Sequence, residues 1–257
     1  MPKSQKNNVI LNNISEYIGN TPLIRLDTVS SKDKYNIFAK CEYLNPGCSI
    51  QDRLNKEIIQ EKIINGELKK NTIVNSISLN LVNDDNKKSN NKKNLLLFPN
   101  KNELCKKINI TTYDTNKYYL NLAEEIYTQM NGKIDVIFIS DQPNGSICGI
   151  GNRLKALIPD ITIVGVMCMD EKDFSLKKEL DKIPSVNDRG IVDVWSEVNT
   201  KSLIETIQNI ISNEGLLCGK NSAALIKCAS SYVKEFYKNK FINCVVILPD
   251  HLMNDFT

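Results

Sequence analysis

The sequence predicts an α/β fold with a largely parallel, doubly wound sheet. Short apolar strands alternate with amphipathic helices through its second half, which is typical of parallel sheets connected by helices. These strands are almost continuously apolar, as expected when helices cover both faces of a sheet. The 257 residues are 41% hydrophobic and 25% charged, so the chain has the length and composition to bury a substantial core.

The first elements are expected before residue 80. The run "YNIFAKCEYL" at 35–44 favours a strand, and a Pro-Gly turn follows it at 46–47. Apolar residues at helical spacing predict a helix within 49–68, with Gly66 as its stop signal. A further short strand is expected at 71–78.

The composition changes abruptly at "NDDNKKSNNKKN", residues 83–94. This stretch has almost no apolar content, so we expect a solvated or disordered spacer. A solvated spacer explains its lysines better than a binding patch does. The run "NLLLFPN" that follows favours a strand.

From Lys117 onward the alternation becomes regular. Helices are expected at 118–132, 147–158, 200–215 and 222–239, and strands at 133–140, 161–169, 191–198 and 241–250. Ligands of such sheets bind beyond the carboxyl ends of the strands. Three loops are therefore candidates: "NPGCS" at 45–49, "DQPNGS" at 141–146, and "GKNS" at 219–222.

Several function classes are excluded by composition. A net charge of +3 gives no global field that attracts nucleic acid, and no apolar run approaches the length of a membrane span. The eight cysteines are scattered without a CxxC pair, and the N-terminal "MPKSQKNN" lacks a secretory core, so a reducing, cytoplasmic location is expected. His251 is the only histidine, which excludes histidine-rich metal sites.

Several ordered blocks carry a family resemblance. "YIGNTPLIRL", "AKCEYLNPGCSIQDR" and "GELKKNTIV" resemble the opening of the pyridoxal-phosphate β-family, fold type II, which contains cystathionine β-synthase and cysteine synthase. "GKIDVIFIS", "NRLKALIPDITIVGV", "IPSVNDRGIVDVW", "EGLLCGKNSA" and "CVVILPDHLMNDFT" are most similar to the animal-type cystathionine β-synthases. The resemblance spans residues 14–257, with a gap in the middle.

The resemblance implies a reaction that depends on a lysine, and this chain lacks a lysine at the corresponding position. Family members hold pyridoxal phosphate as a Schiff base on a lysine, which also removes the α-proton of serine or acetylserine before a thiol adds. The family pattern Asn-(Pro or Ala)-Gly-Gly-Ser-Val-Lys-Asp-Arg places that lysine at Gln51. A carboxamide forms no imine and is not a base near neutral pH. Lys40 and Lys56 lie out of register with this position.

The other loops that bind cofactor or substrate in the family have also lost most of their characteristic residues here. In the substrate-carboxylate loop Asn80 remains, at the position that contacts the ring hydroxyl of the cofactor. In the phosphate loop Gly145 and Ser146 remain, but Pro143 has no N–H to offer a phosphate. Asn221 stands where a serine meets the pyridine nitrogen. These four residues, Asn80, Gly145, Ser146 and Asn221, are the candidate cofactor contacts, and at most weak non-covalent binding is expected.

Purely structural roles explain some of the same residues. "SIQD" fits a helix capping box between Ser49 and Asp52, and Ser222 fits the N-cap of the final helix. Gly145 and Ser146 fit a helix cap in the same way.

The domain organisation is also expected to be reduced. Residues 1–44 and 116–257 are predicted to form the large α/β domain, and 45–115 a truncated small domain containing the spacer at 83–94. No N-terminal haem-binding extension and no C-terminal regulatory module is expected.

Three hypotheses remain open. The first is a cystathionine β-synthase-like pseudoenzyme with a lyase fold, retained for binding or assembly as a homodimer or as a heteromer with an active paralogue, with no metal, haem, nucleic acid or membrane partner. The second is a residual pyridoxal-phosphate-dependent lyase or synthase of cysteine metabolism, joining serine or cysteine with homocysteine. The third is an unstable product without a molecular role.

Overall fold

A computed structural model describes residues 10–11, 13–31, 34–66, 115–141, 146–169, 190–199, 203–237 and 240–255. The strands are β1 (Leu23–Arg25), β2 (Tyr35–Cys41), β3 (Val136–Ser140), β4 (Thr162–Met169), β5 (Val194–Asn199) and β6 (Ile242–Leu248). The α-helices are α1 (Gln51–Ile64), α2 (Leu120–Gln129), α3 (Ser146–Leu157), α5 (Ile204–Glu214) and α6 (Lys220–Phe236). Short 3-10 helices are η1 (Ile14–Tyr17), η2 (Glu42–Leu44), η4 (Thr115–Tyr119) and η6 (Leu252–Asp255).

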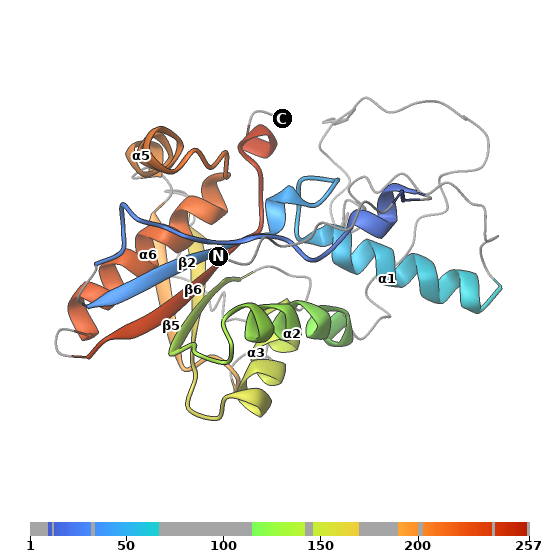
Figure 1. Ribbon diagram of the computed structural model, residues 1–257, viewed down its shortest axis with the longest axis horizontal. Coiled ribbons are helices and arrows are strands. Elements are labelled where there is room, and N and C mark those ends of the chain that lie inside the picture. The colour runs from blue at the N-terminus through green and yellow to red at the C-terminus, as the bar shows by residue number, and fades with distance from the viewer. Residues whose placement is uncertain are drawn as a thin grey trace, which may run out of the picture.

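The strands form one six-stranded sheet in the order β1-β2-β6-β3-β4-β5. All neighbours are parallel except β1, which pairs antiparallel with β2 at one edge. Helices α5 and α6 lie on one side of the sheet, and α2 and α3 on the other (Figure 1). The prediction of a largely parallel, doubly wound sheet is therefore confirmed.

Successive residues of the central strands enter two separate cores. In β6, Val246 and Leu248 pack in the cluster beneath α5 and α6, while Val245 and Ile247 pack in the cluster beneath α2 and α3. Side chains alternate across a strand, so a strand buried on both faces has to be apolar at every position. This requirement explains the continuous apolar run "CVVIL" at 244–248.

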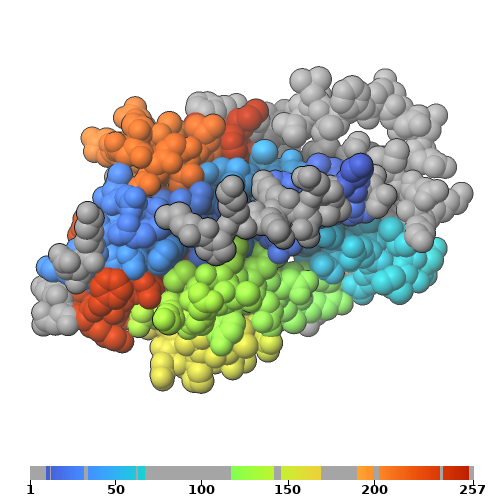
Figure 2. Space-filling view, viewed as in Figure 1, coloured from blue at the N-terminus to red at the C-terminus, as the bar shows by residue number. Residues whose placement is uncertain are grey.

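Helix α1 packs against the same core as α2 and α3. Its residues Leu54 and Ile58 are at most 2% exposed and share a cluster with Tyr119 and Leu122. Figure 2 shows the surface of α1, in cyan, beside the light-green surface that begins at η4. The helix ends at Ile64, followed by Gly66 at φ 76°, so the predicted stop signal is confirmed.

Some predicted elements lie outside the described residues. These are the strands at 71–78 and 94–100 and the spacer at 83–94. The predicted division between a large domain and a small domain that starts at residue 45 stays a prediction. Among the helices that the structure describes, none has the length and apolarity to span a membrane.

Candidate functional site

Two of the three candidate loops, those at 45–49 and 141–146, follow strands that end at the same edge of the sheet. Cys41 at the end of β2 lies in register with Leu248 at the end of β6. Strand β3 runs parallel to β6 with Phe138 beside Val246, so it ends at the same edge. The loops that follow β2, β3 and β6 therefore leave the sheet together, where ligands of open α/β sheets bind.

Backbone hydrogen bonds connect two of these regions. The N–H of Ile50, just before α1, donates to the carbonyl of Pro249 at 3.0 Å, and Ser49 forms a β-bridge with Asp250. The N–H of Gly219, just before α6, donates to the carbonyl of Asp250 at 2.9 Å. The segment after β6 thus joins the start of α1 to the start of α6.

Gln51 is the first residue of α1 and is half-buried. Its N–H donates to the hydroxyl of Ser49 at 3.2 Å, which ties the start of the helix to the loop before it. The predicted capping box between Ser49 and Asp52 is wrong, because each of the two side chains bonds to a different residue. The carboxylate of Asp52 accepts from the N–H of Gly47, five residues back, because the tight turn brings that N–H to the carboxylate. The two side chains stabilise the helix start by separate bonds.

Cys48 adopts a strained backbone conformation in this loop. Its φ of 59° lies in the left-handed region, where a side chain other than glycine or asparagine costs about 1–2 kcal/mol. The family pattern has its second glycine at this position, which was the signal in the sequence that the backbone turns here.

Neither neighbouring lysine presents a free amine to the start of α1. Lys40 is fully buried in β2, and its ammonium donates to the carbonyl of Thr21, to Glu125 and to Gln129 at 2.8–2.9 Å. These three bonds use all three donors of the ammonium. Lys56 reaches back toward the carbonyl of Ile18, at 3.4 Å. The amine of Lys40 thus bonds to Thr21 and to residues of α2, and that of Lys56 to Ile18.

A buried ion network of Lys40, Glu42, Arg53 and Glu125 lies beneath the site. Arg53 donates to both oxygens of Glu42 at 2.6 and 2.9 Å, and to both oxygens of Glu125 at 2.8 Å. Lys40 donates to Glu125 as well, and the four side chains are between 0% and 17% exposed. Residues from β2, η2, α1 and α2 are fixed to one another by this network.

The charges in this network shift one another's pKa values. Burial alone raises the pKa of Glu125, but the hydrogen bonds and charges of Arg53 and Lys40 outweigh burial and lower it to about 2. Burial lowers the pKa of Lys40, and the charge and hydrogen bond of Glu125 oppose that shift. The network consists of two cations and two anions, so its net charge is zero.

Sequence reasoning missed this network, although one signal was present. Lys40 lies between Ala39 and Cys41 in β2, and a lysine buried in a sheet requires an anionic or strongly hydrogen-bonding partner. The partner could not be identified from the sequence, because Glu125 lies 85 positions further along the chain.

At the start of α6, Asn221 is bound to the chain itself. Its backbone N–H and its side-chain amide donate to one oxygen of Asp250 at 3.1 and 3.0 Å. The bond to Asp250 uses one of the two N–H groups of the Asn221 amide and fixes the direction of its side chain. Asp250, an acidic residue two positions after the end of β6 at the carboxyl edge of the sheet, was not singled out from the sequence.

The prediction that Ser222 is the N-cap of this helix is wrong. The helix begins at Lys220 after Gly219, so Ser222 lies inside the first turn, fully buried. Its N–H and hydroxyl both donate to Asp250. The acidic side chain from the neighbouring strand end satisfies the N–H groups that a serine N-cap would have satisfied.

The remaining candidate cofactor contacts are only partly visible. Ser146 is the first residue of α3 and is 2% exposed. Asn80 and Gly145 lie outside the described residues, as does Pro143. The structure therefore places Gln51, Ser146 and Asn221 at the starts of three helices at the carboxyl edge.

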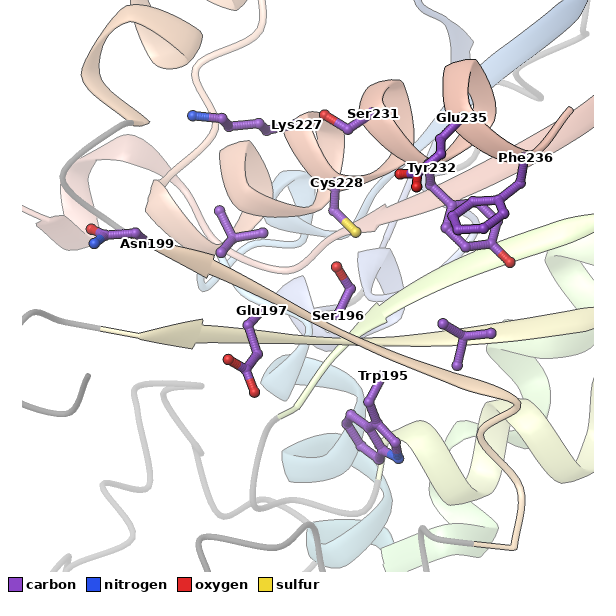
Figure 3. Close-up of a pocket in the computed structure, with 12 residues that line it drawn as sticks. Trp195, Ser196, Glu197, Asn199, Lys227, Cys228, Ser231, Tyr232, Glu235 and Phe236 are labelled. Atoms are coloured by element: carbon purple, nitrogen blue, oxygen red, sulfur yellow. The ribbon is translucent and has the colours of Figure 1, made fainter. Parts of the chain in front are cut away.

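A groove of about 360 Å³ lies elsewhere, between the edge strand β5 and α6. Figure 3 shows Cys228 of α6 pointing toward Ser196 of β5 inside it. Gln51, Ser146 and Asn221 do not line this groove. Among the described residues no group of three histidine, cysteine, aspartate or glutamate side chains is arranged to hold a metal ion.

Comparison with known proteins identifies distant relatives. The family model described as "Pyridoxal-phosphate dependent enzyme" matches residues 14–81. Cystathionine beta-synthase of Dictyostelium discoideum is 28% identical, over 97% of this chain and 61% of that protein. The enzyme of the same name from Mus musculus is 27% identical, over 95% of this chain and 54% of that protein. The chain thus spans little more than half the length of these curated relatives.

Solved structures show the same fold. An O-acetyl serine sulfhydrylase, isoform 3, from Entamoeba histolytica superposes with a TM-score of 0.72 at 21% identity, covering 99% of this chain and 92% of that one. A cysteine synthase from the same organism gives a TM-score of 0.73 at 20% identity, covering 100% and 92%. The predicted fold type II is confirmed by these superpositions.

The buried ion network predicts a large effect from neutralising Glu125. A Glu125→Gln variant leaves Lys40 and Arg53 short of an anion, so we expect the free energy of unfolding to fall by roughly 3 kcal/mol in urea titrations at pH 7. Since the folded-state pKa of Glu125 lies below its ordinary value, its contribution is full above about pH 5 and is lost as the pH falls toward 2. The variant should lack that part of the acid dependence.

The adjacent Glu124 is the matched control. It pairs with Arg153 at the surface, where both side chains are about 40% exposed, so Glu124→Gln should change stability by less than about 1 kcal/mol. Equal effects of the two substitutions would contradict a special role for the network.

The strained backbone at Cys48 predicts a stabilising substitution. Cys48→Gly should raise the free energy of unfolding by up to about 1 kcal/mol, because glycine adopts a φ of 59° without strain and this gain exceeds its extra unfolded-state entropy. Asn20→Gly is the control. Asn20 also has positive φ, at 47°, but asparagine tolerates it, so no gain is expected. A Cys48→Gly protein no more stable than the Asn20→Gly protein would refute the assignment of strain.

Proposed function

We propose that this chain, a distant homologue of the cystathionine beta-synthases and cysteine synthases, is a catalytically inactive pseudoenzyme of cysteine metabolism. The observation that carries the proposal is Gln51, which stands at the first residue of α1 where the family's Schiff-base lysine is expected. When bound, pyridoxal phosphate acts as an electron sink that stabilises the carbanion left after α-proton removal. That chemistry needs an amine that forms the imine and a base that takes the proton, and a carboxamide is neither.

The neighbouring side chains support the absence of covalent cofactor chemistry. The amine of Lys40 has three acceptors and is itself fully buried, so it is not a free nucleophile. Lys56 bonds to the N-terminal segment. Asn221, at the pyridine-nitrogen position, is engaged by Asp250. Any pyridoxal phosphate that binds is therefore expected to bind weakly and without a covalent bond.

Cofactor titration tests this proposal directly. We expect the wild-type protein with pyridoxal phosphate to give the visible absorption of the free aldehyde alone, with no added Schiff-base band. A Gln51→Lys variant restores the amine and should also lack the band, because the phosphate loop is altered at Pro143 and Asn144. Free cofactor with an unrelated protein is the control.

The alternative, a residual lyase or synthase, makes the opposite prediction. It requires hydrogen sulfide or cystathionine formation from serine or cysteine with homocysteine, at a rate above that of free cofactor. A Schiff-base band in the wild-type protein together with such turnover would overturn the proposal. A band that forms in the Gln51→Lys variant alone would show that the rest of the cofactor site is intact.

The retained role that we propose is binding or assembly, as a homodimer or as a heteromer with an active paralogue. Ile10, Ile14 and Tyr17 of the N-terminal segment are 94%, 59% and 55% exposed, which is unusual for large apolar side chains this close in sequence and supports an interaction surface. In sedimentation velocity we expect a species of two chains, alone or with the paralogue. Replacing Ile14 and Tyr17 by serine should weaken that species, whereas replacing the equally exposed Phe236 on α6 should not. A protein that stays monomeric and does not bind the paralogue would contradict an assembly role.

A further inference from the structure

The hydroxyl of Tyr119 is a buried polar group that the fold leaves without a protein partner. Tyr119 ends η4 and is 0% exposed. Among the described residues, its Oη is the buried side-chain atom for which no hydrogen bond is formed. A hydroxyl taken out of water without a replacement partner is costly, so most such groups in folded proteins bind a protein group or an ordered water.

Tyr119 packs in the same apolar cluster as Ile50 and Leu54, and η4 contacts α1, the helix that carries Arg53. Burial raises the pKa of Tyr119, and the charges of Glu42 and Arg53 also act on it. Each oxygen of Glu42 already accepts two hydrogen bonds. One accepts from Thr21 and Arg53, and the other from Arg53 and Asn45.

Glu42 is therefore saturated as an acceptor. A carboxylate offers about four lone-pair sites, and the four bonds from Thr21, Arg53 and Asn45 use them all. Tyr119 cannot donate to Glu42 without displacing one of these donors. This saturation explains why the Tyr119 hydroxyl has no bond to Glu42.

Arg53 adds an unused donor rather than an acceptor. A guanidinium carries five N–H groups, and the bonds of Arg53 to Glu42 and Glu125 use four of them. Among the described residues, the O–H of Tyr119 and one N–H of Arg53 are therefore donors without an acceptor. The hydrogen of the Tyr119 hydroxyl needs an acceptor, and that acceptor has to be small because Tyr119 is 0% exposed.

We infer that one internal water molecule binds at Tyr119 Oη and accepts the hydrogen of the tyrosine hydroxyl. Water is the smallest molecule that accepts and donates hydrogen bonds, and internal waters typically satisfy buried polar groups of this kind. Ordering one water costs less than leaving a buried hydroxyl unbonded. The site belongs to the support beneath the "NPGCS" loop and is independent of whether any cofactor binds.

The test is a crystal structure of the full chain at a resolution that shows ordered water. We expect a single water oxygen within about 3.2 Å of Tyr119 Oη. In a Tyr119→Phe variant this water should be lost or displaced. A Tyr119 hydroxyl bonded directly to a protein group, or a dry contact without water density, would overturn the inference.

The neighbouring Tyr118 is the matched control. Its hydroxyl donates directly to Glu61 at 2.6 Å, so a Tyr118→Phe variant removes a protein–protein bond and should retain the water at Tyr119. Water magnetic relaxation dispersion in solution gives a second readout, with one long-lived water fewer in Tyr119→Phe and an unchanged number in Tyr118→Phe. Equal water counts in the wild type and in Tyr119→Phe would also refute the site.

Discussion

The buried ion network of Lys40, Glu42, Arg53 and Glu125 is the constraint on which the arrangement of the site depends. Four charges are removed from water, each at a desolvation cost of several kcal/mol, and they are tolerated because every one is paired and hydrogen-bonded. The bidentate contacts of Arg53 fix the directions of the Glu42 and Glu125 carboxylates, so the side chains of the network have little freedom to move. The start of α1 therefore keeps its place on β2 and α2 whatever residue occupies position 51.

This arrangement separates the scaffold of the site from its chemistry. The network, the Asp250 contacts at α6 and the two apolar cores hold the helix starts at the carboxyl edge of the sheet. None of these interactions involves the side chain at position 51. A chain of this fold can lose the imine-forming lysine and still fold, which is the physical basis for expecting a pseudoenzyme rather than an unfolded product.

The fold was predictable because its signals are local or periodic. The apolar run of β6 and the helical spacing of α5 each specify an element, and the alternation of elements specifies a parallel sheet. The partners of polar groups were not predictable in the same way. Lys40 requires an anion, but only the three-dimensional fold brings Glu125 to it, and Asp250 reaches Ser222 from a segment 28 residues away. For the same reason Ser49, Asp52 and Ser222 fit capping patterns in the sequence and bind other partners in the structure.

Intact-mass spectrometry after borohydride reduction measures whether a chain with Gln51 forms a covalent link to pyridoxal phosphate. The wild-type protein is incubated with a modest excess of pyridoxal phosphate, reduced, and compared with a sample labelled after unfolding, in which buried and surface lysines are both accessible. We expect no stoichiometric adduct on the folded protein and no modified peptide within residues 35–66. One reduced cofactor per chain, on Lys40, Lys56 or another single lysine, would contradict this expectation.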